Sequence, residues 1–291
     1  MMDPIGASAA AIRAHYDVSN AFYSLWLDET LTYSCALWDG PDDARDLASA
    51  QRNKIAWHLA SARAEQAERL LDIGCGWGST LAQAGQMGRL KQSVGLTLSR
   101  AQADHINSLA LEKAEVRLES WRDHAPVAPY DSLISIGAFE HFTKRAHTSG
   151  EKIKIYREFF QRCHSWLSAG GAFSLQTIAY GRSHQADPRM LDLWGEIFPD
   201  SEMPRLEEIV LAARDIFEIV SLRNDRSDYA RTCELWARRI RARRNEAIAL
   251  IGEAKVAAFE RYLKYSAFGF LSGNMQLLRF TLLPLRNAVD D

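Results

Sequence analysis

The stretch that decides the fold lies at residues 72–78 and reads Asp-Ile-Gly-Cys-Gly-Trp-Gly. The apolar run at 69–73 that leads into it is typical of a buried strand, and the residues at 79–87 that follow it predict a helix. Glycines at alternate positions of this turn let the backbone approach a ligand where a Cβ atom would clash. Because open α/β sheets bind ligands beyond the carboxyl ends of their strands, the turn predicts a nucleotide-like ligand.

Outward from this turn, short β-rich runs alternate with longer helical stretches. Further strands are expected at 93–98, 116–120, 132–136, 172–178, 217–222 and 276–283. Helices are expected from an N-cap at Ser99 to about 113, at 152–167 with a left-handed cap at Gly170-Gly171, at 228–250 and at 253–267. This rhythm predicts an α/β fold with a doubly wound, mostly parallel seven-stranded sheet and helices on both faces.

The composition is that of an ordinary globular protein, with 47% hydrophobic and 25% charged residues in a chain of 291. A formal net charge of −2 argues against bulk nucleic-acid binding, so we expect no nucleic-acid partner. The four cysteines have neither metal-ligand spacing nor a dense disulfide pattern, and we expect no metal and a reducing, cytoplasmic location. No signal peptide is apparent, and no apolar run reaches the length of a membrane span.

The end of the second strand separates two kinds of nucleotide fold. A dinucleotide-binding unit, like many methyltransferases, places Asp or Glu there to bind ribose hydroxyls. Residues 96–102 read Leu-Thr-Leu-Ser-Arg-Ala-Gln and contain no acid. The missing acid disfavours a dehydrogenase and is also unusual for a generic methyltransferase.

Residues 71–78, followed by Gly-Leu-Thr-Leu-Ser-x-x-Gln at 95–102, are similar to the pattern of the cyclopropane-fatty-acid and mycolic-acid cyclopropane synthases. Other segments match this family in the same order: His-Tyr-Asp-Val-Ser-Asn at 15–20, Thr-Tyr-Ser-Cys-Ala at 32–36, Ile-Gly-Ala-Phe-Glu-His-Phe at 136–142, the stretch 229–236 and Glu-Arg-Tyr at 260–262. Because the likeness covers nearly the whole chain, the protein is identified as a member of this family of S-adenosylmethionine-dependent methyltransferases.

The resemblance implies a class I, Rossmann-like methyltransferase fold that binds S-adenosylmethionine and releases S-adenosylhomocysteine. Residues 1–60 would form a helical N-terminal cap over the cofactor, and residues 61–291 would form the methyltransferase core. Within the core, 179–215 and the helical insertion at 228–272 would cover the substrate and contribute to the acceptor pocket.

The resemblance also assigns the residues around the cofactor. Gly74 and Gly76 would lie beneath its methionine portion, with Tyr33 and Ser34 covering that end. For Trp121, simple core packing is an equal alternative. The full set of expected cofactor contacts is Tyr33, Ser34, Asp72, Gly74, Gly76, Leu96, Thr97, Gln102, Ser120, Trp121 and Ile136.

Methylation of an alkene leaves a carbocation, which needs a dry, apolar or aromatic pocket and a base that removes a proton. Expected walls of this acceptor pocket are Tyr16, Tyr23, Phe139 and Tyr262. In the family, a bound bicarbonate takes the proton. The groups that would hold it here are Cys35, Glu140, Tyr229 and backbone near Ile136, with Cys35 as a small polar contact and no nucleophile.

One position departs from the family pattern. Members usually carry a histidine in the strand after the long helix, and Gln176 stands at that place. Glutamine donates hydrogen bonds through its amide but cannot become cationic, so it would hold an anion less firmly. Two interpretations stay open: bicarbonate binds through a weaker set that includes Gln176, or Glu140 acts more directly as base on another acceptor.

Three functions are therefore compared. The first is methyl transfer to a carbon–carbon double bond of a lipid or lipid-like acceptor, giving a cyclopropane or a methyl-branched product. The second is C- or N-methylation of a specialised metabolite, which Gln176 and the short segment 179–193 favour, and the third is a non-catalytic S-adenosylmethionine-binding module. The basic run Arg238–Arg244 could contact an acyl carrier protein or a membrane surface, or simply form a solvated helix face.

Overall fold

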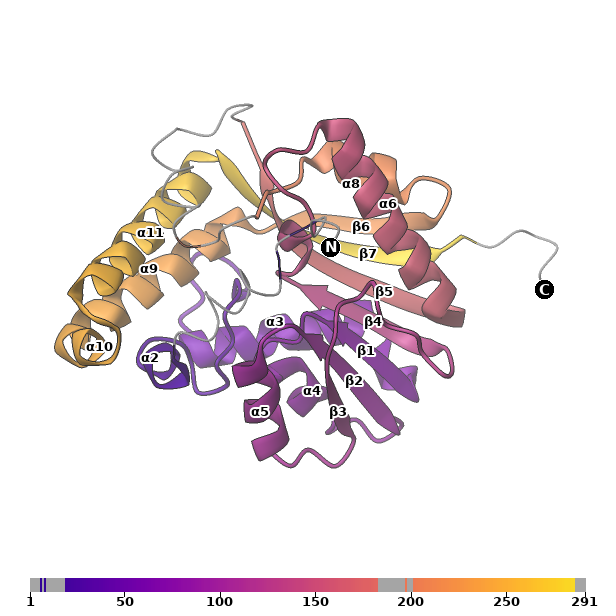
Figure 1. Cartoon of the computed structure of the whole chain (residues 1–291), viewed down its shortest axis with the longest axis horizontal. Helices are drawn as coiled ribbons and strands as arrows, with labels where there is room; N and C mark the ends of the chain where they lie inside the picture. The colour runs from indigo at the N-terminus through magenta and orange to yellow at the C-terminus, as the bar shows by residue number, and fades with distance from the viewer. Residues whose placement is uncertain (1–5, 7, 9–18, 183–196, 198–200, 286–291) are drawn as a thin grey trace.

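The structure is a computed structural model that describes residues 6, 8, 19–182, 197 and 201–285 (Figure 1). The expected pocket residue Tyr16, and the residues 183–196 and 198–200 of the expected substrate cover, lie outside this described part of the chain.

A seven-stranded sheet forms the centre of the fold, with the strand order β3-β2-β1-β4-β5-β7-β6. Its strands are β1 (Arg69–Ile73), β2 (Gln92–Thr97), β3 (Ala114–Leu118), β4 (Tyr130–Ile136), β5 (Leu167–Tyr180), β6 (Phe217–Asn224) and β7 (Met275–Pro284). β7 runs antiparallel to both β5 and β6, and the remaining neighbours are parallel. The predicted seven-stranded, mostly parallel α/β sheet is confirmed.

Two layers of helices cover the two faces of this sheet, and a further group lies beyond one edge (Figure 1). The helices are α2 (Asn20–Ser24), α3 (Leu47–Ser61), α4 (Ser79–Ala84), α5 (Arg100–Ser108), α6 (Ser149–Trp166), α8 (Leu206–Ala213), α9 (Arg226–Ala242), α10 (Arg244–Ile251) and α11 (Glu253–Ser272), with short 3-10 turns η1 (Ala64–Gln66) and η2 (Phe139–His141).

The alternation of side chains along each strand builds a separate core on each face. Leu70 of β1 joins Ile55 of α3 and Leu81 of α4 in one hydrophobic cluster. Leu71, the next residue, points to the other face and joins Phe159 of α6 in a second cluster. This continuous apolar pattern, buried on both sides, is what a parallel strand between two helical layers requires.

A third cluster, rich in aromatic rings, lies beyond the sheet. It joins Phe22 of α2, Trp236 of α9 and Phe259 of α11. α9 follows β6, which runs in the same direction as β5, so these helices begin at the edge where the parallel strands end. Figure 1 shows α9, α10 and α11 together at one end of the molecule, with α2 beside α10.

Several boundaries differ from the prediction. α5 ends at Ser108, five residues early, and the backbone becomes left-handed at Ala110 with φ of 50°. α6 ends at Trp166 because Leu167 is already extended and pairs with Tyr130 of β4, so Gly170 is left-handed inside β5 and does not cap the helix. The single helix predicted at 228–250 is two helices, which meet at Arg243.

No helix in the described part of the chain combines the length and the apolar content needed to cross a bilayer.

The packing of the glycine turn predicts a stability effect at Gly95 of β2. A Cβ atom at Gly95 would lie 2.7 Å from Leu81 Cδ1 and 2.8 Å from Cys75 Sγ, so Gly95→Ala should overpack the core. We expect a loss of about 1–3 kcal/mol of unfolding free energy, measured by urea denaturation. Gly88→Ala is the matched control, because a Cβ there meets nothing within 4 Å. Equal stability of the two variants would contradict this account of the turn.

Candidate active site

A large cavity of about 670 Å³ lies at the carboxyl ends of β1, β2 and β4. Its wall combines the glycine turn, the end of β2, the segment 31–34 and the loop after β4. All the residues that the motifs assigned to the cofactor line this one cavity: Tyr33, Ser34, Asp72, Gly74, Gly76, Leu96, Thr97, Gln102, Ser120, Trp121 and Ile136.

The glycine turn forms the floor of the large cavity. The backbone N–H groups of Gly74 and Cys75 both donate to Leu96 O, at 3.0 and 2.9 Å, and hold the turn against the end of β2. A Cβ atom on Gly74 would lie 2.5 Å from Ala138 Cβ, whereas one on Gly76 would meet nothing within 4 Å. Gly74 is thus needed for close packing, whereas Gly76 leaves room for a ligand. Both residues also have positive φ angles, of 81° and 53°, which favour glycine.

A hydroxyl and an amide stand where other nucleotide folds have an acid. Thr97 Oγ1 donates to Gln102 Oε1 at 2.7 Å. Ser99 Oγ accepts from Gln102 N at 3.1 Å, which confirms Ser99 as the N-cap of α5. Trp121 combines both roles considered for it, because it lines the cavity while its ring centre lies 5.2 Å from that of Phe142.

The polar end of the large cavity holds an acid and a base that face the same space. Burial raises the pKa of Asp72 to about 7, and its Oδ1 has no hydrogen-bond partner among the described residues. Lys54 Nζ donates to Ser34 Oγ at 2.9 Å, and burial lowers the pKa of Lys54 to about 8. These groups suit a ligand that carries both a cationic and an anionic group.

A small cavity of about 30 Å³ adjoins the large one, which is room for a water molecule or a small anion. Its lining residues are Tyr33, Ser34, Gly137, Glu140, His141, Gln176, Ile178, Tyr229, Tyr262 and Leu277. Tyr33, Ser34, Gly137 and His141 line both cavities. The structure therefore brings together Glu140, Gln176, Tyr229 and Tyr262, which the sequence assigned to the acceptor site.

Glu140 forms no ion pair with the described residues, and its carboxyl accepts a hydrogen bond from Thr177. Burial raises the pKa of Glu140 to about 7, although the hydroxyl of Thr177, which donates to Oε2 at 3.0 Å, opposes this shift. A carboxyl with a pKa near neutrality can accept or release a proton at physiological pH, as a general base requires.

Cys35 lies close to this centre but lines neither cavity in the described part of the chain. Its thiol donates to Ala36 O at 3.0 Å, and burial raises the pKa of Cys35 to about 12. The group therefore stays a thiol, in agreement with the expectation that it is no nucleophile.

Two of the expected aromatic walls, Phe139 and Tyr23, need correction. Phe139 was expected in the acceptor pocket, but its ring stacks on Tyr156 with centres 4.2 Å apart and lies in the core under α6, because η2 turns it inward. Tyr23 lies behind the large cavity, with its ring centre 5.5 Å from Tyr33 and 4.9 Å from Trp77. Neither Phe139 nor Tyr23 lines the cavities formed by the described residues.

Sequence reasoning missed three buried groups: Lys54, which lines the large cavity, and His58 and Arg279, which contact Gln176 of the small cavity. Lys54 and His58 lie on α3, where charged and polar residues are usual and gave no signal. Arg279 did carry a signal, because it is the single charged residue of the mostly apolar strand β7. A lone arginine in a buried strand predicts a specific partner, since a buried charge must be paired.

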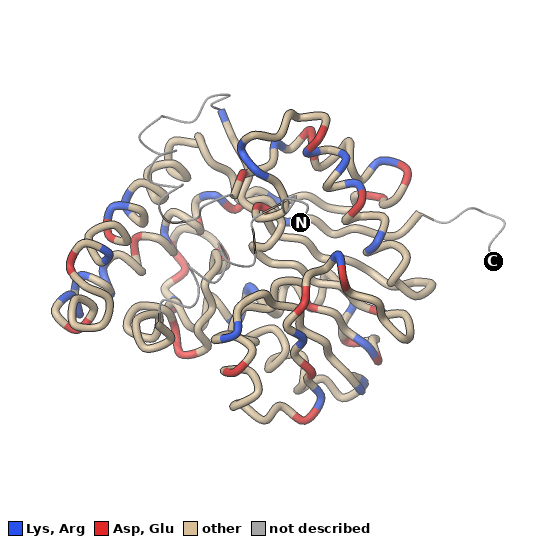
Figure 2. The backbone as a smooth tube through the Cα atoms, in the orientation of Figure 1, with Lys and Arg blue, Asp and Glu red and all other residues tan. Residues whose placement is uncertain are grey.

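The basic run Arg238–Arg244 is largely engaged with its own chain. Arg239 donates to Leu27 O at 2.8 Å, and Arg243 pairs with Glu246 at 2.6 Å. Arg244 lies 3.3 Å from Glu253. Figure 2 shows blue and red segments mixed at this end of the molecule.

Burial of Glu140 predicts a pH-dependent stability difference. A raised pKa means that the folded state binds the proton of Glu140 more tightly than the unfolded state does. The contribution of this proton to the free energy of unfolding is therefore complete below the pKa in the unfolded chain, about 4.3, and is lost as pH rises through about 7. Glu140→Gln has no such titration. Between pH 5 and pH 8 its free energy of unfolding, measured by urea denaturation, should therefore rise by up to about 3 kcal/mol relative to that of the wild type. The exposed control Glu207→Gln should follow the wild type, and a pH-independent difference for Glu140→Gln would refute the buried carboxyl.

Comparison with known proteins agrees with this geometry. The family described as mycolic acid cyclopropane synthetase matches residues 6–280. Cyclopropane mycolic acid synthase 1 of Mycobacterium tuberculosis is 34% identical over 282 residues, which cover 91% of this chain and 92% of that protein.

Solved structures show the same relationship. A crystal structure of a mycolic acid cyclopropane synthase complexed with SAH and CTAB matches with a TM-score of 0.85 and 32% identity, over 96% of this chain and 99% of that one. A coclaurine N-methyltransferase structure matches with a TM-score of 0.78 but 18% identity, over 97% and 84% of the two chains, which shows the shared fold alone. The chain belongs to the mycolic acid cyclopropane synthetase family, as its motifs predicted, and is thus an enzyme of the S-adenosylmethionine-dependent methyltransferase class.

Proposed function

We propose that this enzyme methylates a carbon–carbon double bond of a lipid or lipid-like acceptor and yields a cyclopropane or a methyl-branched product. The observation that carries the proposal is the junction of the two cavities at Tyr33, Ser34, Gly137 and His141. It sets a cofactor-sized cavity beside a small one that contains the proton acceptor Glu140. The names of the relatives, cyclopropane mycolic acid synthases, support a lipid acceptor.

The large cavity fits S-adenosylmethionine, whose sulfonium supplies an activated methyl group when it is bound. Oδ1 of Asp72, which has no partner among the described residues, suits the ammonium group of the methionine portion, and the Lys54–Ser34 pair suits its carboxylate. At the other end, Gln102 and Trp121 would hold the adenosine.

The residues of the small cavity would then control a cation on the acceptor. Tyr33, Tyr229 and Tyr262 present aromatic rings, which can stabilise a carbocation without reacting with it. Burial raises the pKa of Tyr229 well above its usual value, so its phenol stays neutral there. Tyr229 and Tyr262 come from α9 and α11, which supports the proposed role of residues 228–272 in the acceptor pocket.

Completion of the reaction requires loss of one proton. When the proton leaves the transferred methyl group, the electron pair of the broken C–H bond closes the cyclopropane ring. When the proton leaves a neighbouring carbon, that electron pair forms a new double bond and a methyl branch remains. Glu140 would take this proton, either directly or through a small bound anion such as bicarbonate. The amide of Gln176 and the hydroxyl of Tyr229 are donors for such an anion.

A second candidate is C- or N-methylation of a specialised metabolite on the same scaffold. Gln176 in place of the family's histidine favours it. A non-catalytic binding module is disfavoured because Glu140, Gln176 and Tyr229 meet at one cavity beside the cofactor space.

We further propose a cytoplasmic location, because the four cysteines are buried and free. An acyl carrier protein or a membrane surface would meet Arg241 of the basic run, which has no ion pair in the described part of the chain.

Replacement of Glu140 tests the chemical step. Glu140→Gln should lower kcat by about 10²–10⁴-fold, since amides do not accept protons, while the Kd for S-adenosylhomocysteine changes less than about twofold. Mass spectrometry with panels of unsaturated lipids, carrier-bound acyl chains and amines detects the product as a gain of one CH₂, and NMR separates ring, branch and N-methyl group.

The control for this experiment is Glu207→Gln, an exposed carboxylate remote from both cavities. Unchanged turnover of Glu140→Gln would eliminate Glu140 as base. A gain of CH₂ on amines alone would replace the lipid acceptor by the second candidate.

Replacement of Asp72 tests the cofactor site. Asp72→Asn keeps the shape of the side chain but removes its charge, so it should weaken S-adenosylhomocysteine binding by about 10–100-fold. The loss cannot come from unfolding if the variant melts at or above the wild-type temperature at pH 8, as removal of a buried charge predicts. Calorimetry would measure the Kd, and unaltered affinity would remove Asp72 from the site.

A further inference from the structure

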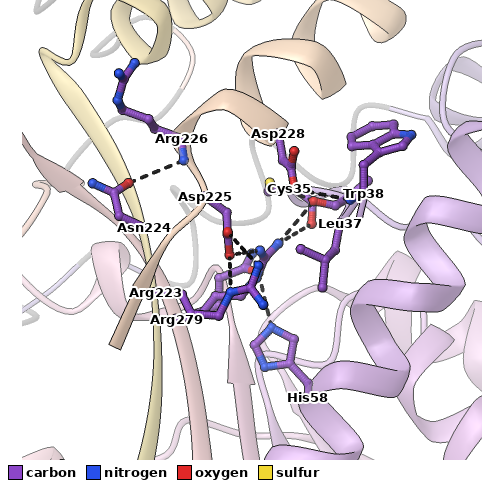
Figure 3. Close-up of polar contacts among 12 residues, drawn as sticks. Cys35, Leu37, Trp38, His58, Arg223, Asn224, Asp225, Arg226, Asp228 and Arg279 are labelled. Atoms are coloured by element: carbon purple, nitrogen blue, oxygen red, sulfur yellow. Dashed lines mark hydrogen bonds and ion pairs between the residues drawn. The ribbon is translucent and has the colours of Figure 1, made fainter. Parts of the chain in front are cut away.

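A single buried arginine connects the three segments that carry the proposed acceptor site. Arg279 is fully buried on β7. Its Nε donates to Gln176 Oε1 of β5 at 2.8 Å, and its Nη2 donates to Ala36 O at 3.1 Å and to Cys35 O at 3.3 Å. Its Nη1 forms an ion pair with Asp225, which precedes α9 (Figure 3).

The sheet register brings Arg279 and Gln176 together. The two residues lie opposite each other in the antiparallel pair β5–β7, so their side chains leave the same face of the sheet. The neighbours of Arg279, Leu278 and Phe280, are buried apolar residues, as a central strand requires. An arginine between them must be desolvated, and such a buried pair is weak as a stabilising device. Stability alone therefore does not account for it.

The arginine decides how the amide of Gln176 is turned. A guanidinium has only donors, so the amide atom that faces Arg279 must be the oxygen. The same oxygen lies 3.2 Å from His58 Nε2, which must then be the protonated nitrogen of that ring. His58 Nδ1 accepts from the hydroxyl of Ser174 at 2.8 Å, which completes a consistent chain of donors and acceptors.

This orientation directs the other end of the amide. With Oε1 held by Arg279 and His58, the NH₂ group of Gln176 remains, and it has no hydrogen-bond acceptor among the described residues. Gln176 lines the small cavity together with Glu140 and Tyr229. The two free N–H groups are thus presented to the space where the reaction would take place.

We propose that Arg279 is the positioning residue of the acceptor site: it turns the Gln176 amide so that its NH₂ group faces the cavity, and it places a permanent cation behind that amide. The proposal rests on the function proposed above. Asp225 and the carbonyls of Cys35 and Ala36 accept hydrogen bonds from Nη1 and Nη2 and so fix the guanidinium in place behind the amide. Where the family pattern has one histidine, this chain would use a glutamine with a buried arginine behind it.

The test replaces each partner and their combination. Arg279→Lys keeps the charge for Asp225 but loses the planar fork, so Gln176 should lose its orientation. We expect kcat to fall by about tenfold or more, with KM and the Kd for S-adenosylhomocysteine within about twofold. Gln176→Met, which has similar volume and no amide, should give a similar loss. The double variant should be no slower than Gln176→Met, because Arg279 acts through that amide.

Arg223→Lys is the matched control. Arg223 is a half-exposed arginine that also pairs with Asp225, with Nη2 3.0 Å from Oδ1, but it has no contact with Gln176. Its turnover should equal that of the wild type, and an equal loss in Arg223→Lys would assign the effect to the Asp225 pair and overturn the proposal. Losses that multiply in the double variant, or full activity of Gln176→Met, would also overturn it.

A second measurement does not depend on the acceptor. The Gln176 amide can be observed by NMR in nitrogen-15-labelled protein, where its side-chain NH₂ signals are those that disappear in Gln176→Met. These signals should shift in Arg279→Lys and in His58→Leu, a variant that leaves the Asp225 pair intact, and should stay in place in Arg223→Lys. Unshifted signals in folded Arg279→Lys and His58→Leu would overturn the proposal. Shifted signals without turnover on any acceptor would leave the positioning intact and refute the proposed function instead.

Discussion

The constraint on which this site depends is the burial of charge at the carboxyl edge of the sheet. The guanidinium of Arg279 is buried inside the protein, where the low dielectric strengthens its electrostatic effect on its neighbours. Burial lowers the pKa of both Lys54 and His58, and the positive charge of Arg279 is the second cause of both shifts. The partners of Arg279 lie on three different segments, so one buried ion organises the junction of the N-terminal segment, the sheet and α9.

The two cavities differ in the ionisable groups that line them. In the large cavity, the carboxyl of Asp72 and the ammonium of Lys54 lie at one end, where a zwitterionic ligand would compensate the cost of burying them. The small cavity has neutral groups around Glu140, since burial lowers the pKa of His141 to about 4 and raises that of Tyr229. Such a division suits a polar cofactor beside the acceptor of the proposed reaction.

The sequence predicted the site as far as local patterns reach. Strand ends and the glycine turn are local features, and parallel strands bring their ends to one edge, so the ligand crevice was correctly expected beyond β1. The other residues assigned to the cofactor, from 33 to 136, came from the family resemblance, and they line the same cavity. Phe139 was misplaced because a motif gives a position along the chain but not the direction of a side chain in a 3-10 turn. Arg279 and His58 were missed because they are 103 and 118 residues away from Gln176, and only the register of the sheet and the packing of α3 bring them together.

The exchange of histidine for glutamine changes the nature of the acceptor site more than its shape. A histidine at this place could donate as a cation only while it is protonated, so its strength as a donor would vary over the range in which Glu140 also titrates. The amide of Gln176 has no titrating proton and donates in the same way at every pH, with the guanidinium of Arg279 behind it. Gln176 can therefore hold an anion, or the oxygen of an acceptor, without competing with Glu140 for a proton. In the proposed reaction, a single titrating residue would both attract the ligand and exchange a proton. This chain would divide these functions: Arg279 and Gln176 would attract the ligand, and Glu140 would exchange the proton.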